Sequence, residues 1–132
     1  MPFTAAEIAY LATQPLGRLA TARPDGTLQV SPVGFSYHPE LATIDIGGWN
    51  MSASRKYRNV VANGRVAFVV DDLPSVDPWR VRCLEIRGVA EGVEQPDGSA
   101  LIRIHPRRII SFGVDDQDRE PHALVPHNRD VT

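Results

Sequence analysis

The fold is decided by a strand, a turn and a second strand in one stretch, Leu16-Gly-Arg-Leu-Ala-Thr-Ala-Arg-Pro-Asp-Gly-Thr-Leu-Gln-Val-Ser-Pro-Val-Gly-Phe-Ser-Tyr37. The Pro24-Asp25-Gly26 in its middle favours a tight turn, because proline presets φ and glycine accepts a positive φ. Short apolar runs bounded by such turn signals are typical of strands. We therefore predict strands over residues 17–23 and 27–37.

The second of these strands changes its apolar phase along its length. Leu28 and Val30 alternate on one face, whereas the apolar positions from Val33 onward have the opposite parity. The change falls near Ser31-Pro32, and a proline belongs at an edge or a bulge because it cannot donate to the ladder. The pattern fits either a bulge beside a functional site or a plain strand end.

Two short helices accompany the predicted strands. Thr4 and Glu7 have the spacing of a capping box, which predicts a helix that Pro15 then terminates. A second helix fits residues 53–63, where apolar positions recur at a spacing of three and four. Gly64 is suited to end that helix, because glycine readily adopts the left-handed conformation.

The rest of the chain predicts further short strands. We expect strands at residues 43–47 and 66–70, the second buried on both faces because it is continuously apolar. A polar loop over residues 71–78 precedes a long hairpin with arms at 79–94 and 100–114. The sequence therefore predicts a mainly β, α+β fold, a small antiparallel barrel of six strands with two short helices.

We expect one domain over residues 1–114 and a polar tail over residues 115–132, mobile or ordered only against a partner. The 132 residues are 42% hydrophobic, and 11 prolines and 10 glycines indicate many short elements. A net charge of −2 argues against nucleic-acid binding. No apolar run approaches the ~20 residues of a membrane span.

The cysteine content and the first residues of the sequence indicate which covalent links, metal sites and targeting signals to expect. The lone Cys83 excludes a disulfide framework and a cysteine-built metal site within the chain, and we predict no metal. The sequence begins without a basic segment followed by an apolar run, so we expect a cytoplasmic protein without a secretory signal.

One cluster of side chains points to chemistry. Ser54, Arg55, Lys56 and Arg58 stand at the start of the second predicted helix. Cations there oppose the helix dipole, and a bound anion would remove the conflict. A solvated charged face is the alternative. Trp79, after the predicted polar loop, fits a stacking platform, an interface anchor or the edge of a core.

These features together resemble the pyridoxamine 5′-phosphate oxidase superfamily, and in particular its actinobacterial branch of probable coenzyme F420-dependent enzymes. The resemblance covers about residues 3–114. It is carried by Asn50-Met-Ser-Ala-Ser-Arg-Lys-Tyr-Arg-Asn-Val-Val-Ala-Asn-Gly-Arg-Val-Ala-Phe68, by Trp79 with Arg82-Cys-Leu-Glu-Ile-Arg-Gly88, by Gly17-Arg-Leu-Ala-Thr21 with Pro24-Asp-Gly26, and by Ile104-His-Pro-Arg-Arg-Ile-Ile-Ser-Phe-Gly113.

The resemblance implies a split β-barrel of the FMN-binding type, a homodimer that holds a flavin or deazaflavin between its subunits. It implies that Arg55 and Lys56 meet the cofactor phosphate, with Ser54 nearby, and that Trp79 and Arg82 reach the partner subunit's site. It also implies a ring-edge strand at Gln29, Val30, Ser31, Pro32 and Val33, where the phase change becomes a functional bulge, and contacts near the ring or ribityl chain at Trp49 and Asn50.

Departures from the family narrow the expected reaction. The vitamin-making oxidase has an Arg-x-x-x-x-Lys pattern on the ring-edge strand, whereas residues 29–34 carry neither charge here. We therefore predict a coenzyme F420-dependent oxidoreductase that transfers a hydride to an unsaturated small molecule, with no catalytic residue identified. An FMN-dependent oxidoreductase and a non-catalytic flavin or haem-binding protein remain as alternatives.

Overall fold

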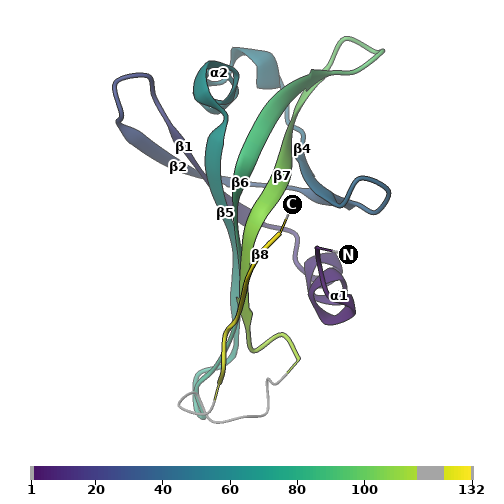
Figure 1. The fold of residues 1–132 in the computed structure, drawn as a ribbon, viewed down its shortest axis with the longest axis vertical. Helices are drawn as coiled ribbons and strands as arrows, with labels where there is room; N and C mark the ends of the chain where they lie inside the picture. Colours follow the sequence, from purple (N-terminus) through teal and green to yellow (C-terminus); the bar gives the residue numbers. More distant parts are fainter. Residues whose placement is uncertain (1, 116–123, 132) are drawn as a thin grey trace.

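The computed structural model describes residues 2–115 and 124–131 as an antiparallel β sheet with two α-helices (Figure 1). The helices are α1 (Ala5–Thr13) and α2 (Arg55–Asn63), with a 3-10 turn η1 (Met51–Ala53) before α2. The strands are β1 (Gly17–Ala22), β2 (Leu28–Val33), β3 (Ser36–His38), β4 (Thr43–Ile46), β5 (Arg65–Ser75), β6 (Arg80–Glu94), β7 (Ala100–Phe112) and β8 (His127–Asp130).

The mainly β, antiparallel prediction with two helices is confirmed, but the strand number and the closure are corrected. The sheet has eight strands rather than six, in the order β2-β1-β5-β6-β7-β4-β3, with β8 also on β7. Within the described residues the path ends at β2 and β3, so backbone pairing does not close a barrel. The extra strands arise because the 27–37 segment divides into β2 and β3, and because β8 forms at the chain's end.

The last strand lies in the stretch expected to be an unstructured tail. β8 pairs with β7 between Ser111↔His127 and Arg108↔Asp130, on the same edge of β7 that β4 occupies further along. Residues 116–123 of the expected tail lie outside the described residues. The absence of apolar periodicity misled the prediction, because β8 is held by backbone pairing and by ion pairs rather than by an apolar face.

Glu7 joins α1 to β8. The predicted capping box is present: the Glu7 amide donates to Thr4 Oγ1 at 3.1 Å, and Glu7 Oε1 accepts from the Thr4 amide at 2.9 Å. Glu7 also accepts from Ser111 Oγ at 2.6 Å and from Arg129 Nη2 at 2.5 Å, forming the Glu7–Arg129 clasp. Burial alone would raise the pKa of Glu7, but these hydrogen bonds outweigh it and hold that pKa below its ordinary value of 4.5.

The core lies on the inner face of the sheet. Gly17 has to be a glycine, because a Cβ there would lie 2.3 Å from the Phe68 ring. Fully buried leucine and isoleucine side chains come from three strands of the sheet: Ile44, Ile46, Leu84, Ile86, Ile102, Ile104 and Ile109.

Within the described chain, no helix is long and apolar enough to cross a membrane.

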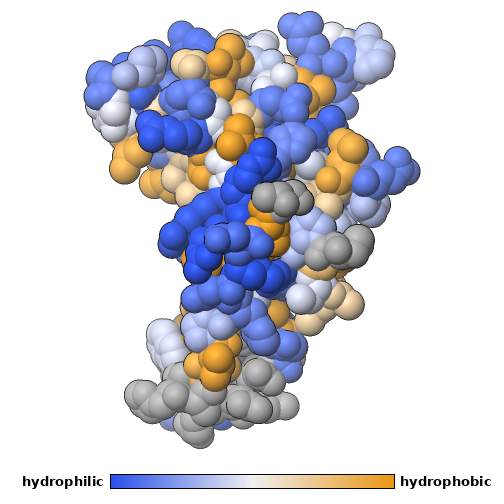
Figure 2. All heavy atoms as spheres, in the orientation of Figure 1, coloured by the Kyte–Doolittle hydropathy of each residue, from blue (hydrophilic) through white to orange (hydrophobic). Residues whose placement is uncertain are grey.

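The opposite side of β2, β1 and β5 is also apolar, and we call it the outer face. Leu28 and Val30 are 78% and 67% exposed, and Ala20 stands opposite both Val30 and Ala67. β5 therefore alternates between a buried and a half-exposed face, which corrects the prediction that it is buried on both faces. Figure 2 shows hydrophilic residues gathered over the middle of the molecule, where β7 and β8 run side by side.

Candidate functional site

Ser54 fixes where α2 begins. Its hydroxyl accepts from the Tyr57 amide at 3.2 Å and donates to the Met51 carbonyl at 2.6 Å, so it acts as the N-cap. The helix therefore starts at Arg55, two positions later than the predicted residue 53, and η1 occupies the intervening turn. Both hydrogen-bonding roles of the hydroxyl serve the backbone, which makes Ser54 a residue that positions the helix start.

The start of α2 carries cations without carboxylate partners. Arg55 and Arg58 are exposed and Lys56 is half-buried, and the first turn contains no acidic residue. None of the three forms an ion pair with any residue in the described ranges. Free backbone amides and a positive helix end add to these charges, so the arrangement fits a phosphate or another anion.

Asn59 attaches this helix to β2. It is 1% exposed, and its Nδ2 donates to Thr21 Oγ1 at 3.0 Å and to Gln29 Oε1 at 3.4 Å. Arg55 and Lys56 precede Asn59 by four and three positions, so they share its face of the helix. The structure thus brings Gln29 and the two predicted phosphate ligands to one side of α2. The same i, i+3 and i+4 spacing in the sequence could have identified Asn59, which the sequence analysis missed.

β2 runs without the predicted bulge. Its register with β1 is continuous from Ala22↔Leu28 to Gly17↔Val33. Gln29, Ser31 and Val33 therefore face inward with Thr21 and Leu19, whereas Val30 and Pro32 face outward with Leu28. The change of apolar phase does not mark a bulge. It arises because the outward residues of β2 are apolar as well, so apolar character does not distinguish the two faces of this strand. The predicted ring-edge residues are accordingly divided between the two faces of β2.

Ser31 has an unused hydrogen-bonding group on the inward side of β2. Its Oγ is buried and has no hydrogen-bond partner among the described residues, and the same holds for Asn59 Oδ1. A buried polar atom without a partner costs free energy, so these atoms are suited to a group that the chain itself does not provide.

Trp49 and Asn50 form the loop that leads into η1. Trp49 is 95% exposed, which is extreme for the largest apolar side chain, and Asn50 adopts a left-handed conformation with φ 54°. The loop places both residues immediately before the cationic end of α2. An exposed tryptophan at that position is available to stack on a planar molecule.

Trp79 and Arg82 lie far from α2 within one chain. β5 starts directly after α2 and runs 11 residues to the turn that carries Trp79, a length of roughly 35 Å at the usual strand rise. Figure 1 shows α2 near one end of the molecule and the β5–β6 turn at the other. The structure does not bring these two predicted site residues to the others, so a site containing all of them needs a second chain.

Arg82 is instead held by neighbours that the sequence analysis missed. Its guanidinium binds both carboxylate oxygens of Asp72, at 2.9 and 2.5 Å, and lies 5.0 Å from the centre of the Tyr10 ring. The Tyr10 hydroxyl donates to Asp72 at 2.8 Å. The hydrogen bonds from Arg82 lower the pKa of Asp72, while burial and then the bond to Asp72 raise the pKa of Tyr10. Tyr10 and Asp72 are 62 positions apart, and the sequence carries no signal for a contact over that separation.

The only cysteine of the chain, Cys83, is half-buried in β6. Burial first, and then the charges of Asp71 and Glu85, raise the pKa of the Cys83 thiol to about 11, so it stays protonated at neutral pH. No group of at least three metal-ligating side chains occurs among residues 2–115 and 124–131.

Comparison with known proteins places the chain in a family. The model of the pyridoxamine 5′-phosphate oxidase family matches residues 3–122. A 5a,11a-dehydrotetracycline/5a,11a-dehydrooxytetracycline reductase of Streptomyces rimosus is 45% identical over 141 aligned positions, covering 100% of this chain and 95% of the relative.

Solved structures share the fold at lower identity. A conserved hypothetical protein of Mycobacterium tuberculosis aligns with a TM-score of 0.69 and 24% identity, over 85% of this chain and 86% of that protein. An FAD-binding protein of Mycobacterium smegmatis aligns with a TM-score of 0.65 and 21% identity, over 83% and 93%. With a family model over most of its length and a relative matching it end to end, the chain belongs to the pyridoxamine 5′-phosphate oxidase family.

Proposed function

We propose that this protein is a deazaflavin-dependent reductase, using coenzyme F420, that delivers a hydride to one carbon of a carbon–carbon double bond in a ring-containing small molecule, while solvent supplies the proton that the other carbon takes up. The observation that carries the proposal is the 45% identity to the Streptomyces rimosus reductase across the whole chain. A match of that extent supports the same class of reaction and the same class of substrate. A reduced deazaflavin or flavin, when bound, supplies the hydride.

The side chains present fit such a cofactor. Arg55 and Lys56 would hold its phosphate at the start of α2, where no acidic residue of the first turn competes. The unpartnered Ser31 hydroxyl, beside Gln29 on β2, would offer a hydrogen bond to the polar edge of a ring. Trp49 and Asn50 would cover the ring or its side chain from the loop before η1. Each of these groups binds or orients, and none is assigned a proton transfer.

The choice between the two cofactors rests on charge. Coenzyme F420 carries a phosphodiester and an acidic glutamyl tail, and Arg58 extends the cationic surface beyond Arg55 and Lys56 in a way that suits such a tail. FMN, with one phosphate, is the alternative that the same cations would accept. A flavin carrier without turnover is the candidate from another class, because the cofactor site does not itself require a reaction.

The working unit we propose is a homodimer. The outer face exposes Leu28 and Val30 together with small apolar neighbours, and burial against a second copy would remove that surface from water. The distance between α2 and the β5–β6 turn supports the same conclusion, because Trp79 and Arg82 could then approach the cofactor of the partner subunit. The site would therefore be built from two chains.

A pair of titrations tests the proposal. Reduced and oxidised coenzyme F420 and FMN are each added to the purified protein, and binding is followed by the fluorescence of the cofactor. We expect micromolar or tighter affinity for coenzyme F420, weaker affinity for FMN, and oxidation of reduced coenzyme F420 when an unsaturated ring ketone is added. Tighter FMN binding with turnover supports the alternative enzyme, binding without turnover supports a carrier, and no binding of either cofactor overturns the proposal.

A further inference from the structure

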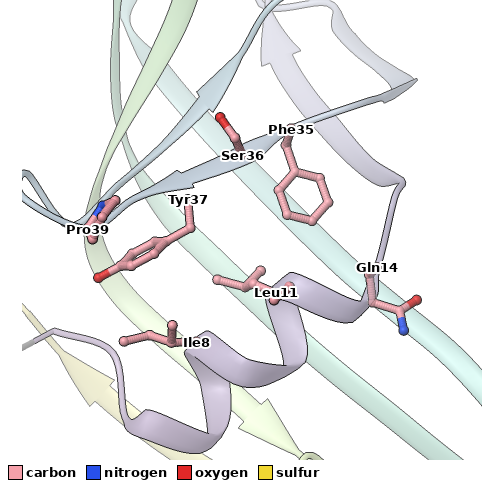
Figure 3. Close-up of a pocket in the computed structure, with 8 residues that line it drawn as sticks. Ile8, Leu11, Gln14, Phe35, Ser36, Tyr37 and Pro39 are labelled. Carbon is pink, nitrogen blue, oxygen red and sulfur yellow. The ribbon is translucent and has the colours of Figure 1, made fainter.

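A groove of about 520 Å³ runs between α1 and the segment from Phe35 to Pro39, which contains β3. Figure 3 shows Ile8 and Leu11 of α1 facing the aromatic rings of Phe35 and Tyr37 across it. Ala12 and Pro39 complete the apolar lining, and Gln14 and Ser36 add polar groups. All eight lining residues are described, and none carries a charge. The volume lies within the roughly 300–1,000 Å³ of small-molecule sites.

The aromatic wall of this groove is held in place from behind. The Phe35 ring packs edge to face on Phe68 with centroids 5.3 Å apart, and the Tyr37 ring packs in the same way on Phe3 at 5.3 Å. Phe68 and Phe3 belong to the buried core. The wall is therefore pre-organised, which reduces the entropy lost when a ligand binds.

The Tyr37 hydroxyl lacks a partner. It is buried, and no described residue forms a hydrogen bond with it. An unpaired buried hydroxyl costs free energy, which an incoming oxygen could recover. Ile8, a partly buried residue of α1, lines the same groove beside the Tyr37 ring (Figure 3).

The groove opens beside the strand proposed to run along the cofactor ring. β2 ends at Val33, and only Gly34 separates it from Phe35 of the groove. A Cβ at Gly34 would lie 4.0 Å from the Pro15 carbonyl oxygen, so this link rests against the chain that leaves α1. A molecule lying in the groove could therefore extend one end toward the ring edge.

We propose that the groove between α1 and β3 binds the uncharged, fused-ring body of the substrate, with the Tyr37 hydroxyl hydrogen-bonded to a ketone or hydroxyl oxygen of that ring system. The inference rests on the proposed function for the identity of the substrate, whereas the groove itself stands on the geometry above. It makes Tyr37 a residue that positions the substrate rather than a proton donor.

The test measures binding of tetracycline, a fluorescent fused-ring probe, to the full-length protein in the presence of a metal chelator. Ala12→Trp fills the groove, and Ala9→Trp is the matched control, because Ala9 is also an exposed alanine of α1 and does not line the groove. We expect a dissociation constant raised at least tenfold by Ala12→Trp and unchanged by Ala9→Trp. Tyr37→Phe should weaken binding by threefold to tenfold without lowering the thermal midpoint, because the hydroxyl has no partner among the described residues.

Other outcomes overturn the assignment. Absence of tetracycline binding to the unaltered protein, equal affinity in Ala12→Trp, or equal loss in Ala9→Trp each contradicts a ligand in this groove. Dissociation of a dimer by Ala12→Trp, seen by sedimentation, would show that a second copy occupies it instead. Coenzyme F420 and FMN are titrated into the same variants. If the cofactor binds and Ala12→Trp leaves the affinity for tetracycline unchanged, only the groove assignment is refuted. If neither cofactor binds to the unaltered protein, the proposed function is refuted.

Discussion

The cationic side chains on the strands of the sheet and those at the start of α2 differ in what neutralises them. Arg129, Arg82 and Arg103 each form a paired hydrogen bond with a carboxylate, to Glu7, Asp72 and Asp45. Arg55, Lys56 and Arg58 have no carboxylate partner within the described residues, although they crowd one helix start. The first group stabilises the fold, because each arginine neutralises a carboxylate that is buried or half-buried and requires a partner. The second group lowers the stability of the free protein, because its cations oppose the positive end of the helix dipole, and a bound anion would relieve this repulsion.

The largest expected effect comes from breaking a pair in the first group. Arg129→Ala leaves Glu7 buried with only the Ser111 and Thr4 bonds, and we expect the free energy of unfolding to fall by about 3 kcal/mol. Urea denaturation measures this loss. Arg23→Ala, at an exposed turn, is the control and should change stability by less than about 0.5 kcal/mol. Equal losses in both variants would remove the distinction between the two groups.

Lys56→Ala is the corresponding change in the second group. It should weaken binding of a phosphate-bearing cofactor by about 1–3 kcal/mol, the scale of hydrogen bonds to charged groups, without lowering the stability of the free protein. Fluorescence titration measures the affinity, and Arg65→Ala, an exposed cation beyond the other end of α2, serves as the control. Unchanged affinity in Lys56→Ala would contradict the phosphate assignment.

Acid should destabilise the folded protein through the Glu7–Arg129 clasp. The pKa of Glu7 is lowered in the folded state, so the unfolded state takes up the proton more readily, and stability is lost as the pH falls below about 4.5 toward the folded-state pKa. Arg129→Ala should show a shallower loss over the same range, because the pKa of Glu7 is then less depressed. Urea denaturation at a series of pH values between 7 and 3 tests this, and parallel curves for the two proteins would contradict it.

The smallest effect sharpens the comparison. Arg55 occupies the first position of α2, where a cation opposes the helix dipole, so Arg55→Gln should stabilise the cofactor-free protein by roughly 0.5 kcal/mol. The gain should disappear in 1 M salt, where screening acts over only about 3 Å. A loss of stability would mean that Arg55 has a structural task like that of Arg129.

Local features were predictable from the sequence and long-range ones were not. The Thr4–Glu7 capping box, the left-handed Gly64 at the end of α2 and the long β6–β7 hairpin are confirmed, because each depends on residues close in the chain. The outward apolar face at Leu28 was taken for a change of phase, because sequence periodicity assumes that only one face of a strand is apolar. The pairing of Arg82 with Asp72 and Tyr10 depends on how β5, β6 and α1 meet, and no local pattern encodes it.

Of the candidate site, the sequence predicted the cationic helix start and the residues of β2, and the structure joins Gln29 of β2 to Asn59 of the same helix; their role in a common site stays a prediction. It could not foresee that the Ser54 hydroxyl caps α2, because the same residue type serves as a cap or as a ligand. Assignment of Trp79 and Arg82 to a shared site stays a prediction, since only a second chain could bring them there.

The Glu7–Arg129 clasp also bears on the order in which the chain folds. Its two residues are 122 positions apart, so forming it closes nearly the whole polypeptide into one loop. That closure is entropically unfavourable until the intervening strands have paired, which shortens the effective loop. The clasp is therefore expected to form after the rate-limiting step, so that it governs how fast the native protein opens rather than how fast it assembles.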